Sequence, residues 1–381
     1  MSPAARSSAT PERRGGGYSA HSVRLAGILA FAYVLTIVYA SLQPFRGWRM
    51  PAPEILAFVG APWPRYITLE DILVNIAAYL PLGFLLSIVC GARYGAGLGV
   101  LAAALCATGV SLTLEAIQMF LPSRIASNVD LLTNGLGALI GAMAAPLFAP
   151  SRILGGKVHA VRHRLFLDGM AADVGLVIVC LWPLTQFHPT AQLFGTGAVK
   201  ATFDLPAYFP AHTPALAFAG EASVVFCNLL GVGMMISALL RDAPRRMAMI
   251  GAVTAAALVI KAVTALALIK ASAPPWGWIT PGVLIGLAGG WVLLYGATRL
   301  PRVAQLALAA LCIMLAAAAV NLAPDNPYQS VPTKLLAGGQ SDFLSFTGIM
   351  RALSELWPLL ALTYLVCAMT LRPPATRPGA Q

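Results

Sequence analysis

Six polar side chains in the first 150 residues form three pairs, each made of one acid and one amide. Within each pair the spacing is three or four residues, so both side chains lie on one face if the segment is helical. The pairs are Asp71 with Asn75, Glu115 with Gln118, and Asp130 with Asn134, and Arg124 lies just before the third pair. Two carboxyl groups could share acid and base chemistry, and a guanidinium can hold a phosphate through its fork of N–H donors.

A purely structural explanation covers part of this pattern. An aspartate at a helix N-terminus caps the helix and lies near the positive end of its dipole, so Asp71 and Asp130 could be caps and nothing more. Glu115 does not fit that explanation, because it lies more than a turn before the end of an apolar segment. An intramembrane ionisable side chain costs roughly 2.5–3.5 kcal/mol at the bilayer centre and is functional by default; Arg124 is the nearest candidate partner. We therefore interpret the pairs as a functional pocket rather than as packing contacts alone.

The chain around these pairs has the composition of a membrane protein. Of its 381 residues, 58% are hydrophobic and 10% are charged, whereas soluble domains have about 25% charged residues. This excludes a soluble enzyme, a DNA-binding domain and a disordered chain. The net charge of +11 is explained by arginines in loops that orient helices beside anionic lipid. We therefore expect the lipid bilayer as a partner, and no nucleic acid.

Apolar segments of about 20 residues, the length that a helix needs to cross a bilayer, predict an all-α polytopic membrane helical bundle. Ten segments qualify: 23–42, 72–90, 98–121, 131–149, 169–187, 219–240, 248–270, 279–298, 304–323 and 345–370. With the N-terminus inside, 16 of the 25 basic residues fall in cytoplasmic segments and seven on the outer side, as the positive-inside rule requires. Both termini are then cytoplasmic, and the acid–amide pairs lie at the outer ends of three helices. A signal peptide cleaved near Ala40 is the alternative, but the run 23–42 is long for one.

Metal and cofactor sites are not indicated. All six cysteines lie inside apolar segments, and no CxxC pair occurs. His159 and His163 are four residues apart in a basic stretch that lacks the carboxylate of an HExxH motif. We interpret that stretch as an interfacial helix, and we expect neither a metal nor another cofactor.

The first part of the chain resembles the VanZ-like membrane protein family. The resemblance is carried by an ordered series of motifs over about residues 25–148: Tyr39-Ala-Ser-Leu-Gln-Pro-Phe45, Asp71, Asn75, Leu80-Pro-Leu-Gly-Phe84, Ser111, Glu115, Gln118, Arg124, Asp130 and Asn134-Gly-Leu-Gly137. It implies an integral protein of the bacterial inner (cytoplasmic) membrane, associated with the cell envelope and with low-level teicoplanin resistance. It also implies a ligand-binding site made by Asp71, Asn75, Glu115, Gln118, Arg124, Asp130 and Asn134. It supplies no reaction.

The second half of the chain contains a weak copy of the first. Two ungapped alignments of the chain with itself bring corresponding positions together in a common order. A shift of 146 residues pairs Glu115 with Lys261, Arg124 with Lys270, and Asn134 with Thr280. A shift of 150 residues pairs Asp71 with Glu221 and Gly83 with Gly233. This predicts two parallel four-helix repeats followed by two additional helices. The copy lacks the acid pattern, because Lys261 replaces Glu115 and Trp276 stands at the position of Asp130. We therefore expect any active site in the first half.

The predicted organisation has six segments. They are a disordered cytoplasmic tail (1–22), a VanZ-like four-helix unit (23–150), a basic cytoplasmic linker (151–168), a degenerate second four-helix unit (169–298), two additional helices (299–371) and a cytoplasmic tail (372–381).

Three functions are compatible with this organisation. The first is an envelope protein whose outer pocket binds a lipid-linked or peptidoglycan-related ligand. The second is an enzyme acting on such a lipid at the outer leaflet, with Glu115 and Asp130 sharing acid and base roles and Arg124 holding a phosphate. The third is a transporter with Lys261 and Glu115 inside the two repeats. Transporters place polar residues at the midplane of several spans, whereas here most lie at helix ends, which favours the first two.

Overall fold

The computed structural model is all-α. It describes residues 18–42, 45, 47–50, 55–64, 67, 69–187, 191–200, 214–268, 275–323 and 343–370. The predicted tail 372–381, residues 1–17 of the predicted tail 1–22, and the proposed repeat match at Lys270 lie outside the described residues.

Eleven α-helices follow one another within these ranges. They are α1 (Ala20–Leu42), α2 (Leu69–Tyr94), α3 (Ala96–Gln118), α4 (Asn128–Ala144), α5 (Ile153–Leu165), α6 (Met170–Leu184), α7 (Pro214–Leu239), α8 (Arg246–Leu268), α9 (Pro281–Ala297), α10 (Arg302–Leu322) and α11 (Phe343–Thr370). Four short 3₁₀ turns accompany them: η1 (Ala57–Gly60), η2 (Ala145–Phe148), η3 (Thr185–Phe187) and η4 (Ala243–Arg245). The all-α expectation is confirmed, and each predicted span coincides with a helix to within a few residues.

Nine helices in the described part of the chain are long and apolar enough to cross a membrane, namely all except α5 and α9. The eighth predicted span, 279–298, corresponds to α9, which has 17 residues and, unlike α4 with η2 and α6 with η3, is not lengthened by a 3₁₀ turn. At 1.5 Å per residue this helix is about 25 Å long, shorter than the ~30 Å hydrocarbon core. Its start is set by Thr280, whose side chain caps the helix by accepting from Val283 N, and by Pro281 in the first turn. The expected ten long spans are thus nine long helices and one shorter apolar helix.

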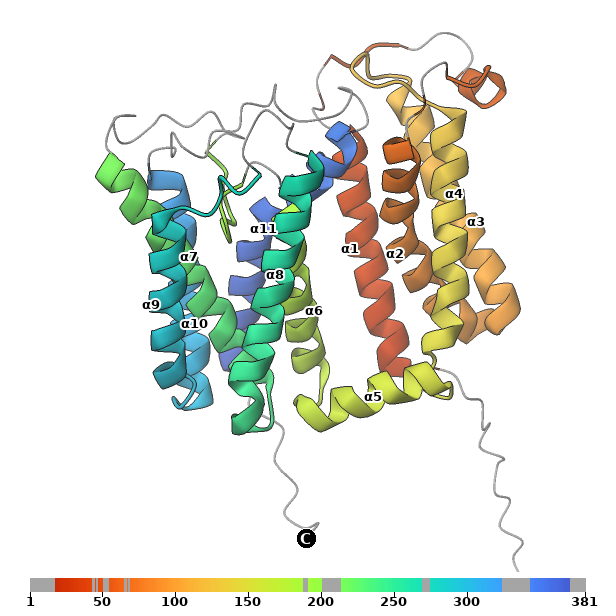
Figure 1. The fold of residues 1–381 in the computed structure, drawn as a ribbon. Coiled ribbons are helices and arrows are strands. Elements are labelled where there is room, and N and C mark those ends of the chain that lie inside the picture. Colours follow the sequence, from red (N-terminus) through yellow and green to blue (C-terminus); the bar gives the residue numbers. More distant parts are fainter. Residues whose placement is uncertain are drawn as a thin grey trace, which may run out of the picture.

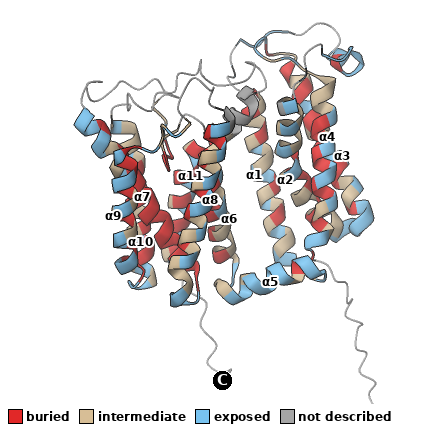
Figure 2. Cartoon of the chain, in the orientation of Figure 1, coloured by how far each residue is buried: buried red, intermediate tan, exposed pale blue. Residues whose placement is uncertain are grey.

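The helices stand side by side in two groups, α1–α4 and α6–α11, while α5 lies across one end of the bundle (Figure 1). We call this the α5 end, and the opposite end, where α2 and α4 begin, the site end. Figure 2 shows exposed residues along the outer faces of the helices. Many exposed residues are apolar: Phe31, Leu98 and Val292 are each about two-thirds exposed or more, at 67%, 66% and 78%. Apolar surface on this scale requires lipid around it, so the protein is an integral membrane protein.

Glycines bring α4 directly onto α2. A Cβ added at Gly137 would lie 2.3 Å from Ile76 O, and one added at Gly141 would lie 2.0 Å from Leu80 O. From the other side, a Cβ at Gly83 would lie 1.9 Å from Ala138 O. The two backbones are therefore in contact, as small residues permit between membrane helices. This contact determines how close the polar side chains at the site end of α2 and α4 can come.

The second group is organised around α7. This helix carries a long run of buried residues, and α10 and α9 are its main neighbours. Gly282, Gly286 and Gly290 of α9 face α7 closely; a Cβ at Gly286 would lie 2.6 Å from Ala222 O. The buried core of this group and the buried cores around α1–α4 share no residue. The two groups thus have separate hydrophobic cores.

Candidate functional site in the α1–α4 group

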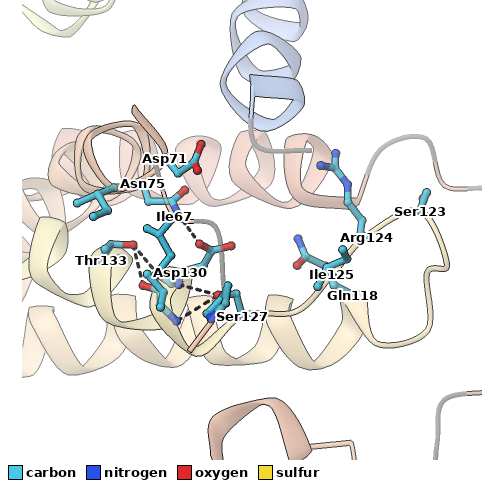
Figure 3. A pocket seen from close by; sticks show the side chains of 13 residues that line it. Ile67, Asp71, Asn75, Gln118, Ser123, Arg124, Ile125, Ser127, Asp130 and Thr133 are labelled. Carbon is cyan, nitrogen blue, oxygen red and sulfur yellow. Dashed lines mark hydrogen bonds between the residues drawn. The ribbon is translucent and has the colours of Figure 1, made fainter. Parts of the chain in front are cut away.

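A cavity of about 170 Å³ opens at the site end of α1–α4. It is lined by the first turns of α2, the α3–α4 loop, the start of α4 and the segment before α2: Pro64, Ile67, Asp71, Ile72, Asn75, Gln118, Ser123, Arg124, Ile125, Ser127, Val129, Asp130 and Thr133. Figure 3 draws these side chains as sticks. The cavity is smaller than the roughly 300–1,000 Å³ of pockets that enclose a drug-sized ligand. It can hold a polar head of a ligand, not a whole lipid.

One wall of the cavity joins α2 to α4. Asn75 donates its Nδ2–H to Asp130 Oδ1 at 2.9 Å. The contact is possible because the glycine contacts described above let these short side chains meet. Asp71 lies one turn before Asn75 on the same helix face and lines the cavity with it. Two acids and an amide from neighbouring helices therefore share this wall.

The start of α4 is held by a chain of local hydrogen bonds. Ser127 is the N-cap of α4, and its Oγ accepts from Val129 N at 3.2 Å and from Asp130 N at 3.4 Å. Asp130 lies in the first helical turn, where the positive end of the helix dipole favours a carboxylate. Thr133 Oγ1 donates to Val129 O at 2.9 Å. The cavity wall is thus built from side chains that the helix terminus already orders.

Glu115 lies behind the cavity and does not line it. Its side chain is buried, with 5% exposed, and Oε2 accepts the backbone N–H of Ser127 at 2.9 Å. Asn134 is also buried behind the wall, where its Nδ2–H donates to Ser111 Oγ at 2.9 Å. These two predicted site residues support the α3–α4 corner, while the other five line the cavity.

The opposite side of the cavity is cationic and contacts α1. Arg124 Nη2 donates to Ala40 O at 3.1 Å, and Gln118 Nε2 donates to Ser41 O at 3.1 Å. Both carbonyls belong to the last turn of α1, where helix carbonyls have no intrahelical partner and the dipole is negative. Arg124 and Gln118 therefore cap the end of α1. In Figure 3 the guanidinium lies well apart from the carboxylates of Asp71 and Asp130.

Several lining residues are absent from the sequence-based set. Ser123, Ser127 and Thr133 line the cavity. Asn128 donates to Ala61 O at 2.7 Å, so the segment beside η1 is held close to the start of α4. The Ser127-Asn-Val-Asp130 stretch is a helix N-terminus signature that could have identified Ser127. The segment before α2 has no comparable signal, because its position depends on contacts made far away in the chain.

Residues 21–149 match the model of the VanZ/LLP1 family. Residues 21–149 are a VanZ/LLP1 family domain. Neither the comparison with curated proteins nor the comparison with solved structures gives a match. The VanZ-like resemblance seen in the sequence is confirmed for residues 21–149, about a third of the chain. The protein is a polytopic membrane protein that contains this domain.

The VanZ/LLP1 domain contains α1–α4 and all seven predicted site residues. The polar residues of the other group are arranged differently. Lys261 is buried and its Nζ donates to Ala191 O at 2.6 Å, while Thr280 Oγ1 donates to Glu221 Oε2 at 2.5 Å across α7 and α9. Among the residues that the structure describes, no group of three or more His, Cys, Asp and Glu side chains could hold a metal ion.

Proposed function

We propose that the VanZ/LLP1 domain binds the polar head of a lipid-linked or cell-wall-related ligand at the outer face of the bacterial cytoplasmic membrane. The observation that carries this proposal is one small cavity with carboxylates on one side and the Arg124 guanidinium on the other. A guanidinium recognises phosphate or carboxylate through paired N–H donors, and carboxylates accept from sugar hydroxyls or amines. A head with an anionic group beside hydroxyls or an ammonium would match both sides.

The position of the cavity supports a ligand that is anchored in lipid. It lies at the ends of apolar helices whose outer faces are exposed, so a lipid chain beside the bundle can deliver its head from the side. With both termini cytoplasmic, as the distribution of basic residues predicts, the site end faces outward. A ligand at that face would be a precursor or product of envelope synthesis, which is how we connect the domain with glycopeptide resistance.

A second candidate function is an enzyme that acts on the same ligand. Asp71 and Asp130 both line the cavity, so two carboxyl groups are available for proton transfer. Glu115 is less suited to that role than the sequence suggested, because its Oε2 already accepts from Ser127 N behind the wall. Binding is our first choice because the lining side chains are mainly hydrogen-bonding groups that also fix the helix ends.

The experiment compares lipids and cell-wall precursors that co-purify with the wild type, Arg124→Gln and Asp71→Asn, identified by mass spectrometry. The matched control is Arg93→Gln, an exposed arginine in the last turn of α2 at the α5 end. We expect one species bound to the wild type and to the control and reduced in both site variants. Equal amounts in all four proteins would refute binding at this cavity. Conversion of the bound species by wild type and not by Asp71→Asn would establish the enzyme instead.

We also propose that α1–α4 and α6–α9 are two repeats of one unit. The support is the parallel between α4 on α2 and α9 on α7, each packed through glycines, and the parallel polar contacts Asn75–Asp130 and Thr280–Glu221. The copies differ at their third helix, since α3 packs on α2 and α4 whereas α8 packs on α6 and α7. Cysteine cross-linking should join α7 to α9 at the level of Glu221 as readily as α2 to α4 at Asn75. Failure of the α7–α9 pair alone would count against the repeat.

A further inference from the structure

A second, larger cavity of about 700 Å³ lies at the α5 end between the two helix groups. Its upper wall is apolar and comes from α1, α2 and α6, with Leu25, Leu29, Leu85, Ile88, Leu176 and Val177. Its floor is polar and comes mainly from α5 and the starts of α1 and α6, with Tyr18, His21, His159, Arg162, His163 and the acid Asp173. Figure 1 shows α5 running across beneath α1 and α6. Along the bundle axis, the cavity therefore changes from an apolar wall between the helices to a polar floor at α5.

The two groups do not close this space with their own side chains. Their buried cores are separate, and α1 meets the second group mainly through α11. Leu29 of α1 and Leu176 of α6 both line the cavity and remain only partly buried. Apolar surface between membrane helices is either packed by protein or covered by acyl chains, because water is excluded there. An elongated apolar ligand fits this wall.

The floor is organised by one acid. Asp173, in the first turn of α6, accepts from Arg162 Nε at 3.0 Å and from Arg162 Nη2 at 2.6 Å through Oδ1. Its Oδ2 lies 2.6 Å from His21 Nε2 of α1. Asp173 therefore positions Arg162 at the cavity. The third guanidinium nitrogen, Nη1, is buried and has no hydrogen-bond partner among the described residues. A buried donor without an acceptor is unfavourable. A small shift of the Arg162 side chain would let Nη1 donate to an acceptor on a ligand in the cavity.

The charge of α5 favours an anion. The helix carries Lys157, Arg162 and Arg164 together with two histidines, and its sequence contains no acid. His159 lines the cavity beside Arg162, with its ring 4.3 Å from that of His163. A basic helix lying along the membrane surface attracts anionic lipid headgroups.

We propose that this cavity binds one anionic phospholipid from the leaflet at the α5 end. Its phosphate lies against Arg162 and His159, and an acyl chain lies between α1 and α6. The lipid then joins the VanZ/LLP1 domain to the second helix group, and this role is independent of the ligand proposed for the site end. The same cavity volume falls within the range of about 300–1,000 Å³ that holds ligands of drug size.

The test is native mass spectrometry of the full chain in detergent, titrated with phosphatidylglycerol or phosphatidylethanolamine. The wild type should retain one phosphatidylglycerol more tightly than any phosphatidylethanolamine. Arg162→Gln should bind it about tenfold more weakly, the loss expected for one charge-assisted hydrogen bond. Arg164→Gln is the matched control, because Arg164 is an exposed arginine of the same helix that does not line the cavity. It should bind like the wild type.

Because Arg162→Gln also removes the contact with Asp173, a second variant tests the apolar wall alone. Leu29→Trp fills the space between α1 and α6 and leaves every floor residue in place. It should also lose the tightly bound phosphatidylglycerol while keeping the wild-type helical content. The proposal is overturned if Leu29→Trp and Arg162→Gln both retain the lipid as the wild type does. It is equally overturned if the wild type holds phosphatidylethanolamine as tightly as phosphatidylglycerol.

Discussion

The buried Glu115 carboxylate accepts the backbone N–H of Ser127 at 2.9 Å, and Ser127 in turn caps α4. An acid on α3 thereby holds the N-cap residue of α4 in the conformation that presents Asp130 to the cavity. The arrangement resembles a capping box in which the acid comes from a neighbouring helix instead of the third residue of the same helix. Glu115 therefore acts on the cavity through Ser127.

Removing the Glu115 acceptor should destabilise the protein. In Glu115→Ala the Ser127 N–H loses a charged partner in a buried position, which costs about 1.5–3 kcal/mol. Glu115→Gln keeps an oxygen acceptor and should lose less. Thermal unfolding in detergent measures both against Thr113→Ala, an exposed site on the same helix. A Glu115→Ala protein as stable as this control would contradict the proposed role.

The Asn75–Asp130 contact predicts the outcome of a residue swap. In the wild type, Asn75 donates to Asp130 at 2.9 Å. Asn75→Asp replaces this donor with a second carboxylate, and like charges at that distance repel. Asp130→Asn removes the negative acceptor. The double variant Asn75→Asp with Asp130→Asn restores one acid and one amide, so it should recover most of the lost melting temperature. If the double variant is as unstable as the sum of the two single variants, then the side chains do not interact as described.

The glycine contact between α2 and α4 should not tolerate a methyl group. Gly137→Ala puts a Cβ 2.3 Å from Ile76 O, and overpacking of this kind costs about 1–3 kcal/mol. The matched control is Gly109→Ala in α3, where a Cβ would meet nothing within 4 Å. Because alanine is the better helix former, Gly109→Ala should leave stability unchanged or raise it by up to about 1 kcal/mol. Equal effects of the two substitutions on the melting temperature would refute the close approach.

One ion pair outside the spans gives a pH dependence. Asp168 lies between α5 and α6, and a hydrogen bond from Arg241, aided by His163, lowers the pKa of its carboxyl below the ordinary value of 3.8. A lowered pKa in the folded state contributes stability that is present above pH 4 and is lost as the pH falls through the folded pKa. Asp168→Asn should therefore melt below the wild type at pH 5–7, with a difference that shrinks below pH 4.

The control for this prediction is Asp242→Asn, which removes a local ion pair with Arg245 three residues away. That pair does not join separate elements, whereas Arg241 also donates through Nε to Phe166 O at 2.7 Å and so connects the α5–α6 segment with the end of α7. Asp242→Asn should show little change in melting temperature at any pH. A difference between wild type and Asp168→Asn that stays constant down to pH 3 would show that the carboxyl has no lowered pKa.

The sequence by itself determined the membrane class, the positions of the long helices and the domain family. These are local properties: a bilayer demands about 20 apolar residues per span, and helical periodicity alone puts Asp71 with Asn75, and Glu115 with Gln118, on one face. The order of the polar pairs along the chain was sufficient for the VanZ-like resemblance. The prediction was wrong about the length of one span. The helix α9 begins after its N-cap Thr280 and ends at Ala297, which makes it shorter than a full span.

Only the tertiary structure decided which of the predicted site residues line the cavity. Glu115 and Asn134 lie behind it because α3 packs against α4 and buries their face, while Arg124 and Gln118 reach the last turn of α1, about 80 residues earlier in the chain. The approach of α2 to α4 depends on glycines that match across the two helices. The amphipathic cavity at the α5 end arises from α1, α2, α5 and α6 together. Such contacts join residues far apart in the chain, and spacing along a single helix carries no information about them.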